Sequence, residues 1–140
     1  MQMATEDRVE VIEEYPHSCR IVREDEYDEP RYHYEGPLGR VKSFSSLEKA
    51  RLYADVQTVT GGFREEKTGE RGVPPAVARA REDVLMAYLA AQPTMGFEWT
   101  ARFFSDIEDD VIRDYIRLVQ EHAISVREEE NSDSGETNDL

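Results

Sequence analysis

The sequence predicts an α+β protein, in which a small antiparallel sheet plus one helix is followed by a three-helix unit. Short segments rich in β-branched residues precede position 45, and one well-capped helix lies between 45 and 62. Apolar residues then recur at helical spacing from 76 to 127. We therefore expect five parts: a flexible N-terminus (1–8), a β-rich α+β part (9–62), a flexible connector (63–75), the three-helix unit (76–127) and a disordered acidic tail (128–140).

Four strands are predicted in the β-rich part. VEVI (9–12) and CRIVR (19–23) cluster or alternate β-branched residues, and Tyr-Pro-His-Ser forms a turn between them. RYHY (31–34) and LGRVKSF (38–44) form a hairpin across Glu-Gly-Pro. We expect the acidic run EDEYDEP (24–30) to be a charged loop.

The helix after the strands has clear start and stop signals. Ser45-Ser46-Leu47-Glu48 fits a capping box, in which a serine oxygen accepts a backbone N–H and the glutamate reaches back to the cap. Gly61-Gly62 ends the helix. Its apolar face carries residues at helical spacing: Leu47, Ala50, Tyr53, Ala54 and Gln57.

Three further helices are predicted in the second half. Pro74-Pro75 opens the first, which ends before the break at 92–96 and carries one stripe: Val77, Ala80, Val84, Leu85, Tyr88 and Leu89. A short helix follows over 97–105, with Trp99 and Phe103 on its flanks. The last helix begins at Asp109 or Asp110 and has the stripe Val111, Ile112, Tyr115, Leu118, Val119 and His122.

Composition narrows the classes of function. The formal net charge of −14 argues against sequence-independent binding to nucleic acid or to an anionic membrane. No apolar run approaches the roughly 20 residues of a membrane-spanning helix, and the first residues show no secretory signal. Cys19 is the single cysteine, which fits a reducing cytoplasm, so we expect a cytoplasmic protein.

The motif evidence favours neither an enzyme nor a metal protein. Gly-x-Ser-x-Gly and the phosphate-binding Gly-x-x-x-x-Gly-Lys-Ser/Thr are both absent. His17, Cys19 and His33 offer three metal ligands without the second pair that a structural zinc site needs, and we expect no metal and no cofactor. Tyr32 and Tyr34 alternate onto one strand face beside basic residues, which suits either stacking on single-stranded nucleic acid or, as we prefer, the protein core.

Two features resemble known families. The acidic excess with only three lysines resembles proteins of salt-accumulating haloarchaea, in which carboxylates keep the surface hydrated. FEWTARFFSDIEDDVIRDYI (97–116) resembles a helix-turn-helix unit: Ala101 lies midway along the first helix, and Val111 and Tyr115 lie where such units place core contacts. The chain as a whole is similar to small uncharacterised haloarchaeal proteins that join a β-rich part to such a unit.

The resemblance implies a DNA-binding or transcription-regulating accessory protein. Arg113 and Arg117 would contact double-stranded DNA, while Arg102, Arg64 and Lys67 would position the backbone. Two details depart from the family: the apolar residue of the turn (Ser105-Asp106-Ile107) comes one position late, and the second helix begins with acidic residues (108–110) where DNA phosphates would lie.

A second hypothesis needs no nucleic acid. The three helices can form a plain bundle whose stripes are core. Trp99 and Phe103 then form an exposed patch for a protein partner or for a homodimer. The two hypotheses differ in what they require of the surface: DNA binding needs Arg113 and Arg117 to be exposed with few acids nearby, and protein interaction needs an exposed aromatic patch.

Overall fold

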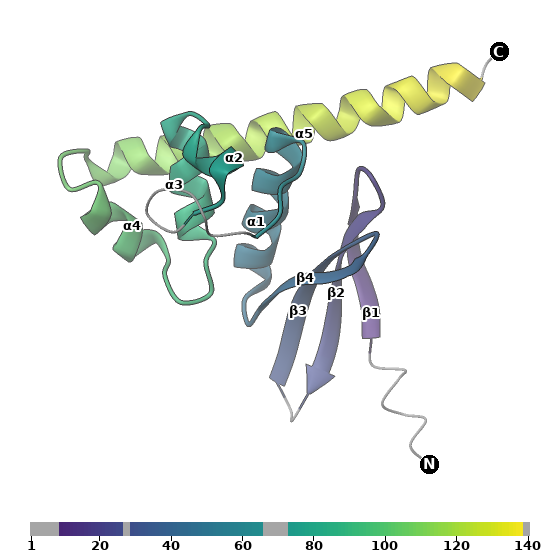
Figure 1. The fold of residues 1–140 in the computed structure, drawn as a ribbon, viewed down its shortest axis with the longest axis horizontal. Helices are drawn as coiled ribbons and strands as arrows, with labels where there is room; N and C mark the ends of the chain where they lie inside the picture. The colour runs from purple at the N-terminus through teal and green to yellow at the C-terminus, as the bar shows by residue number, and fades with distance from the viewer. Residues whose placement is uncertain (1–8, 27–28, 66–72, 139–140) are drawn as a thin grey trace.

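The computed structural model describes residues 9–26, 29–65 and 73–138, with side chains for 9–25, 29–65 and 73–130. The fold is α+β, as predicted, with a four-stranded antiparallel sheet and five helices in this part of the chain (Figure 1). The expected flexible N-terminus (1–8) lies outside the described residues. The elements in order are β1 (Val9–Tyr15), β2 (Cys19–Glu26), β3 (Glu29–Gly36), β4 (Gly39–Phe44), α1 (Leu47–Thr60), α2 (Pro75–Ala78), α3 (Glu82–Ala90), α4 (Phe97–Phe103) and α5 (Asp109–Asn138).

The sheet is a simple meander in the order β1-β2-β3-β4. The prediction of a charged loop over 24–30 is wrong, because β2 continues to Glu26 and β3 starts at Glu29, with Asp25 opposite Pro30. Two charged side chains of this segment have partners on the sheet, because Glu24 Oε1 lies 2.9 Å from His33 Nε2 and Asp25 Oδ1 lies 3.1 Å from Arg23 Nε. The backbone groups of the segment pair across the two strands.

One face of the sheet packs against α1. Ile21, Tyr34 and Phe44 are buried on this face, and the ring of Tyr53 from α1 lies 5.4 Å from the rings of both Tyr34 and Phe44. Tyr32 is half-buried against the same core. The core interpretation of the two tyrosines is therefore confirmed, and the stacking alternative is wrong for the buried Tyr34.

Local signals set both ends of α1 as the sequence predicts, with a shift of one residue at the start. The cap is Ser46, whose Oγ accepts the N–H of Lys49 at 3.3 Å, so Glu48 occupies the second helical position instead of the third. Gly61 ends the helix with φ of 80°, a left-handed conformation that glycine adopts without steric cost.

The single helix expected after Pro74 is wrong, because α2 and α3 are separate helices. Arg81, just before α3, has an extended backbone with φ of −68° and ψ of 163°. Val77 and Met86 are both fully buried. They are nine residues apart, about 2.5 helical turns, and would point to opposite sides of one straight helix. The break lets both side chains reach the core.

The long helix α5 differs from the prediction in its buried face and in its length. It starts at Asp109 as expected, and Ile112, Val119 and Ala123 are buried. Of the predicted stripe, Val111, Leu118 and His122 are exposed, at one edge of this buried face. The helix continues to Asn138, through most of the segment expected to be disordered (128–140), because extending a packed helix requires no new nucleation.

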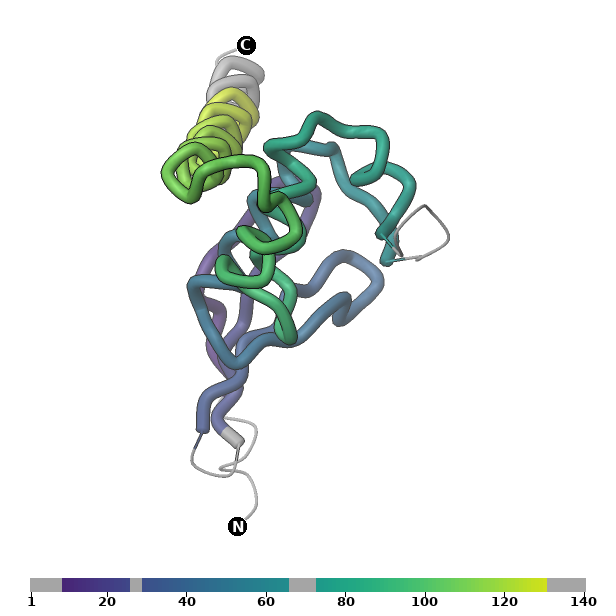
Figure 2. Tube along the Cα trace, turned by 90° about the vertical axis from the view of Figure 1, so that its left-hand side faces the viewer, coloured from purple at the N-terminus to yellow at the C-terminus, as the bar shows by residue number. Residues whose placement is uncertain are grey.

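A single hydrophobic core joins the β-rich part to the helices. The rings of Tyr53 on α1 and Tyr88 on α3 lie 6.4 Å apart, and α5 packs on both α1 and α3. In the view of Figure 2, α5 is seen nearly end-on beside the other helices. Its C-terminal part extends past α1 and beyond the sheet (Figure 1). No helix among the described residues is long and apolar enough to cross a bilayer.

The connector expected over 63–75 is described only at its ends. Phe63 packs against the core, and Val73 is buried in it. The residues between 65 and 73 lie outside the described part of the chain.

Candidate functional site

The two arginines predicted to contact DNA are exposed on α5, but each lies beside an aspartate one turn earlier. Arg113 Nη1 is 3.6 Å from Asp110 Oδ1, and Arg117 Nη1 is 2.9 Å from Asp114 Oδ1. The Arg113 guanidinium also lies over the ring of Phe97, 4.4 Å from its centre. The surface around both arginines therefore carries negative charge as well as positive charge, contrary to what DNA binding requires.

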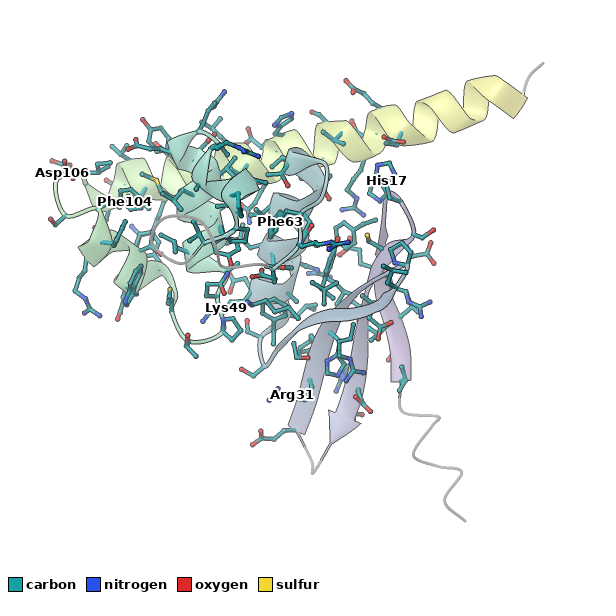
Figure 3. The ribbon with its side chains drawn as sticks, viewed as in Figure 1. His17, Arg31, Lys49, Phe63, Phe104 and Asp106 are labelled. Carbon is teal, nitrogen blue, oxygen red and sulfur yellow. The ribbon has the colours of Figure 1, made fainter. Side chains whose placement is uncertain are left out.

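The start of α5 is strongly acidic. Glu108, Asp109 and Asp110 are exposed there, and Asp106 lies at the outer end of the turn between α4 and α5 (Figure 3). Carboxylates stabilise a helix N-terminus because they complement its partial positive charge. They also repel phosphate from the position at which a recognition helix meets DNA.

The other predicted backbone contacts come from separate places in the fold. Arg102 is exposed in the last turn of α4, and Arg64 is exposed after the end of α1. Lys67 lies outside the described residues. The predicted backbone contacts among the described residues are therefore divided between α4 and the segment that follows α1.

The aromatic pair of the second hypothesis lies at the surface of α4. The rings of Trp99 and Phe103 are stacked, with centres 5.3 Å apart and planes 13° apart. Phe103 is 42% exposed, and Trp99 is half-buried against the core. The ring of the buried Phe104 contacts the ring of Phe103 edge-to-face, with ring centres 5.1 Å apart. This contact packs the aromatic pair against the hydrophobic core. The exposed aromatic surface that protein interaction requires is therefore present.

Charges of both signs surround this pair. Trp99, Arg102 and Phe103 share one face of α4, because residues three and four apart are neighbours on a helix. Arg102 has no ion-pair partner among the described residues, although most described arginines do. We call Trp99, Arg102, Phe103 and the acidic turn that follows (Asp106 and Glu108) the α4 face.

A buried polar cluster between α1 and α3 was not predicted from the sequence. The Glu65 carboxylate accepts the hydroxyls of Tyr53 at 2.6 Å and Tyr88 at 2.9 Å, and Lys42 Nζ is 3.7 Å away. Burial and the nearby Glu65 raise the pKa of both tyrosines, so both hydroxyls stay protonated as donors. These bonds attach the chain beyond α1 to the core.

The three candidate metal ligands do not come together. Cys19 lies on the sheet face that packs on α1, whereas His33 lies on the opposite face and His17 at the tip of the β1–β2 hairpin (Figure 3). His33 is buried, and its ring nitrogens lie 2.7 Å from Ser43 Oγ and 2.9 Å from Glu24 Oε1. Within the described part of the chain, no group of three or more metal-ligating side chains could hold an ion.

A charged cluster joins α1, β1 and α5. Arg51 and Arg127 bind the two oxygens of Glu13 at 3.1 and 3.4 Å, and the Arg127 guanidinium lies 4.5 Å from the centre of the Tyr15 ring. Asp55 is half-buried beside them. Burial, with a smaller effect of Glu13, raises the pKa of Asp55 from 3.8 to about 7, despite the opposing charges of Arg127 and Arg51.

Comparisons with known proteins give no family for this chain. It has no match among protein-family models, and no curated protein or solved structure is significantly similar to it.

Proposed function

We propose that this protein is a non-enzymatic protein-interaction module that forms a homodimer through the α4 face. The observation that supports the proposal best is the stacked Trp99–Phe103 pair, in which Phe103 keeps 42% of its surface exposed. Burying a phenylalanine side chain fully is worth about 1.5–3 kcal/mol relative to leaving it in water. The α4 face carries aromatic residues and an arginine. These residue types are enriched among the interface residues that contribute most to the free energy of binding.

The charges of the α4 face suit a second copy of the same chain. An interface with two-fold symmetry has to be complementary to itself, because each copy presents the same surface. The α4 face carries Arg102, which has no ion-pair partner among the described residues, and the exposed acids Asp106 and Glu108 follow a few residues later. Two copies related by a two-fold axis can pair Arg102 of each with the acidic turn of the other, around a centre of four aromatic rings.

Sedimentation velocity with matched variants tests the proposal. The wild-type chain should have twice its monomer mass of 16.2 kDa at high micromolar concentration. Phe103→Ser and Arg102→Glu should shift the mass towards the monomer. Ile124→Ser is the control, because Ile124 is an apolar residue of similar exposure (51%) on α5. We would measure in dilute and in molar KCl, because the acidic surface suits high salt.

Two outcomes would overturn the proposal. One is a wild-type chain that remains monomeric under both salt conditions. The other is a dimer that Phe103→Ser and Arg102→Glu leave intact, which would place the interface elsewhere on the molecule.

DNA binding through α4 and α5 is a second candidate. It is favoured by the order of short helix, turn and long helix, with Arg113 and Arg117 exposed on the second. At molar salt the release of counterions contributes little, so binding would depend on shape and direct contacts. Recovery of genomic fragments in molar KCl, followed by sequencing, should then enrich a common site. Replacing both arginines by glutamate should abolish the enrichment without unfolding the chain.

A further inference from the structure

A groove separate from the α4 face lies where the end of α1, the link between α2 and α3, and the middle of α5 meet. Its volume is about 600 Å³, within the range of small-molecule sites. None of its lining residues belongs to α4. Much of the lining is apolar: Val59, Ala76, Ala80, Val84, Leu118 and Val119.

The break between α2 and α3 creates this groove. Arg79 ends α2, and the extended backbone at Arg81 turns the chain before α3 begins. The link between α2 and α3 therefore forms one wall of the groove, and α5 forms another. Leu118 on the opposite wall keeps 47% of its surface exposed, so the wall offers apolar contact area that the fold does not use.

The charge available to a ligand in the groove is the positive charge of Arg79. Asp83 is the acidic residue in the lining, and both its oxygens are engaged: Oδ2 accepts from Arg81 Nη2 at 3.0 Å and Oδ1 from the Val84 N–H at 2.8 Å. Arg79 and His122 also line the groove and are exposed, with no hydrogen bond or ion pair to the described residues.

Unpaired basic groups are uncommon on this surface. The chain has 31 acidic residues and 17 basic residues, and most of its described arginines lie beside a carboxylate. An arginine and a histidine that face one apolar groove without a carboxylate partner among the described residues therefore form a local site for negative charge.

We propose that this groove binds a small organic anion with an apolar body, of the medium-chain carboxylate class. The head group would accept hydrogen bonds from the Arg79 guanidinium and from a ring N–H of His122. The apolar body of the ligand would lie on Val59, Ala80 and Leu118. The site and the dimer use different surfaces, so each proposal stands or fails without the other.

Octanoate is the probe, with 1-octanol as the neutral control of the same chain length. Titration followed by ¹⁵N–¹H correlation spectra should shift the amide signals of Val59, Ala80 and Leu118 in a saturable way, and 1-octanol should bind more weakly. Arg79→Gln should weaken octanoate binding about tenfold or more, the loss expected for a charge-assisted hydrogen bond. Arg31→Gln, which changes an exposed arginine on β3 that does not line the groove, should leave it unchanged.

Three results would overturn the proposal. The first is the absence of saturable shifts at the groove residues up to the solubility of octanoate. The second is equal affinity for octanoate in the wild type and in Arg79→Gln. The third is equal affinity for octanoate and 1-octanol, because it would show that the Arg79 guanidinium does not recognise the carboxylate. Phe103→Ser, measured in parallel, distinguishes binding in the groove from binding at the α4 face.

Discussion

Replacing Asp55 by asparagine should stabilise the protein at pH 8 and flatten the dependence of its unfolding free energy on pH. In the unfolded chain this carboxyl loses its proton near pH 4, whereas burial in the folded protein raises its pKa to about 7. Between these two values the unfolded state binds fewer protons than the folded state. The contribution of Asp55 to stability therefore falls as the pH rises from about 4 to about 7.

The size of the effect follows from the shift in the pKa. The pKa of Asp55 rises by about 3, and each pKa unit corresponds to about 1.4 kcal/mol. The loss of unfolding free energy caused by ionising Asp55 is therefore at most about 4 kcal/mol. Asparagine removes the cost of burying a charge but also removes the attraction of the carboxylate to Arg127 and Arg51. We therefore expect a gain of about 1–3 kcal/mol at pH 8 and little gain at pH 4.

Urea unfolding followed by circular dichroism at several pH values measures this effect. Glu121→Gln is the matched control, because it removes one negative charge from an exposed position in the middle of α5. It reproduces the change in net charge without the change in burial. If Asp55→Asn gives no more stability at pH 8 than at pH 4, or no more than the control does, burial of the Asp55 carboxylate does not destabilise the folded protein.

Three further substitutions test the fold. Lys49→Met should lower the unfolding free energy by about 2–3 kcal/mol, because Lys49 Nζ donates to the carbonyls of Gln92 at 3.0 Å and Met95 at 2.6 Å; an unchanged urea midpoint would contradict this. Tyr53→Phe should cost about 1–2 kcal/mol through the lost bond to Glu65, and calorimetry would show it as a lower melting temperature. Gly61→Ala should cost about 1 kcal/mol because alanine is strained at φ of 80°, so equal stability would show that α1 ends differently.

Local signals predicted much of the fold. The strands and the ends of α1 follow from β-branched residues, from a serine cap and from a glycine with positive φ, all of which act within a few residues. The break between α2 and α3 has no such signal, because no glycine or proline lies at 79–81. It results from the burial of Val77 and Met86 in one core, which depends on the rest of the fold.

The candidate site was predictable in part. The helix at 97–105 and its spacing placed Trp99 and Phe103 on one surface. The spacing of three residues between Asp110 and Arg113, and between Asp114 and Arg117, was also a usable signal that both arginines would be paired. The groove and the Glu65 cluster could not be predicted, because their residues come from segments far apart in the sequence.

The emission of Trp99 upon dilution tests the proposed dimer most directly, because this residue is the single tryptophan and lies on the α4 face. Water reaches the ring more freely when the two copies separate. We expect the emission maximum to move to longer wavelength as the protein is diluted, in step with the fall in mass. Phe103→Ser should show the monomer spectrum at every concentration. A fall in mass without a change in Trp99 emission, or a constant monomer mass at all concentrations, would contradict it.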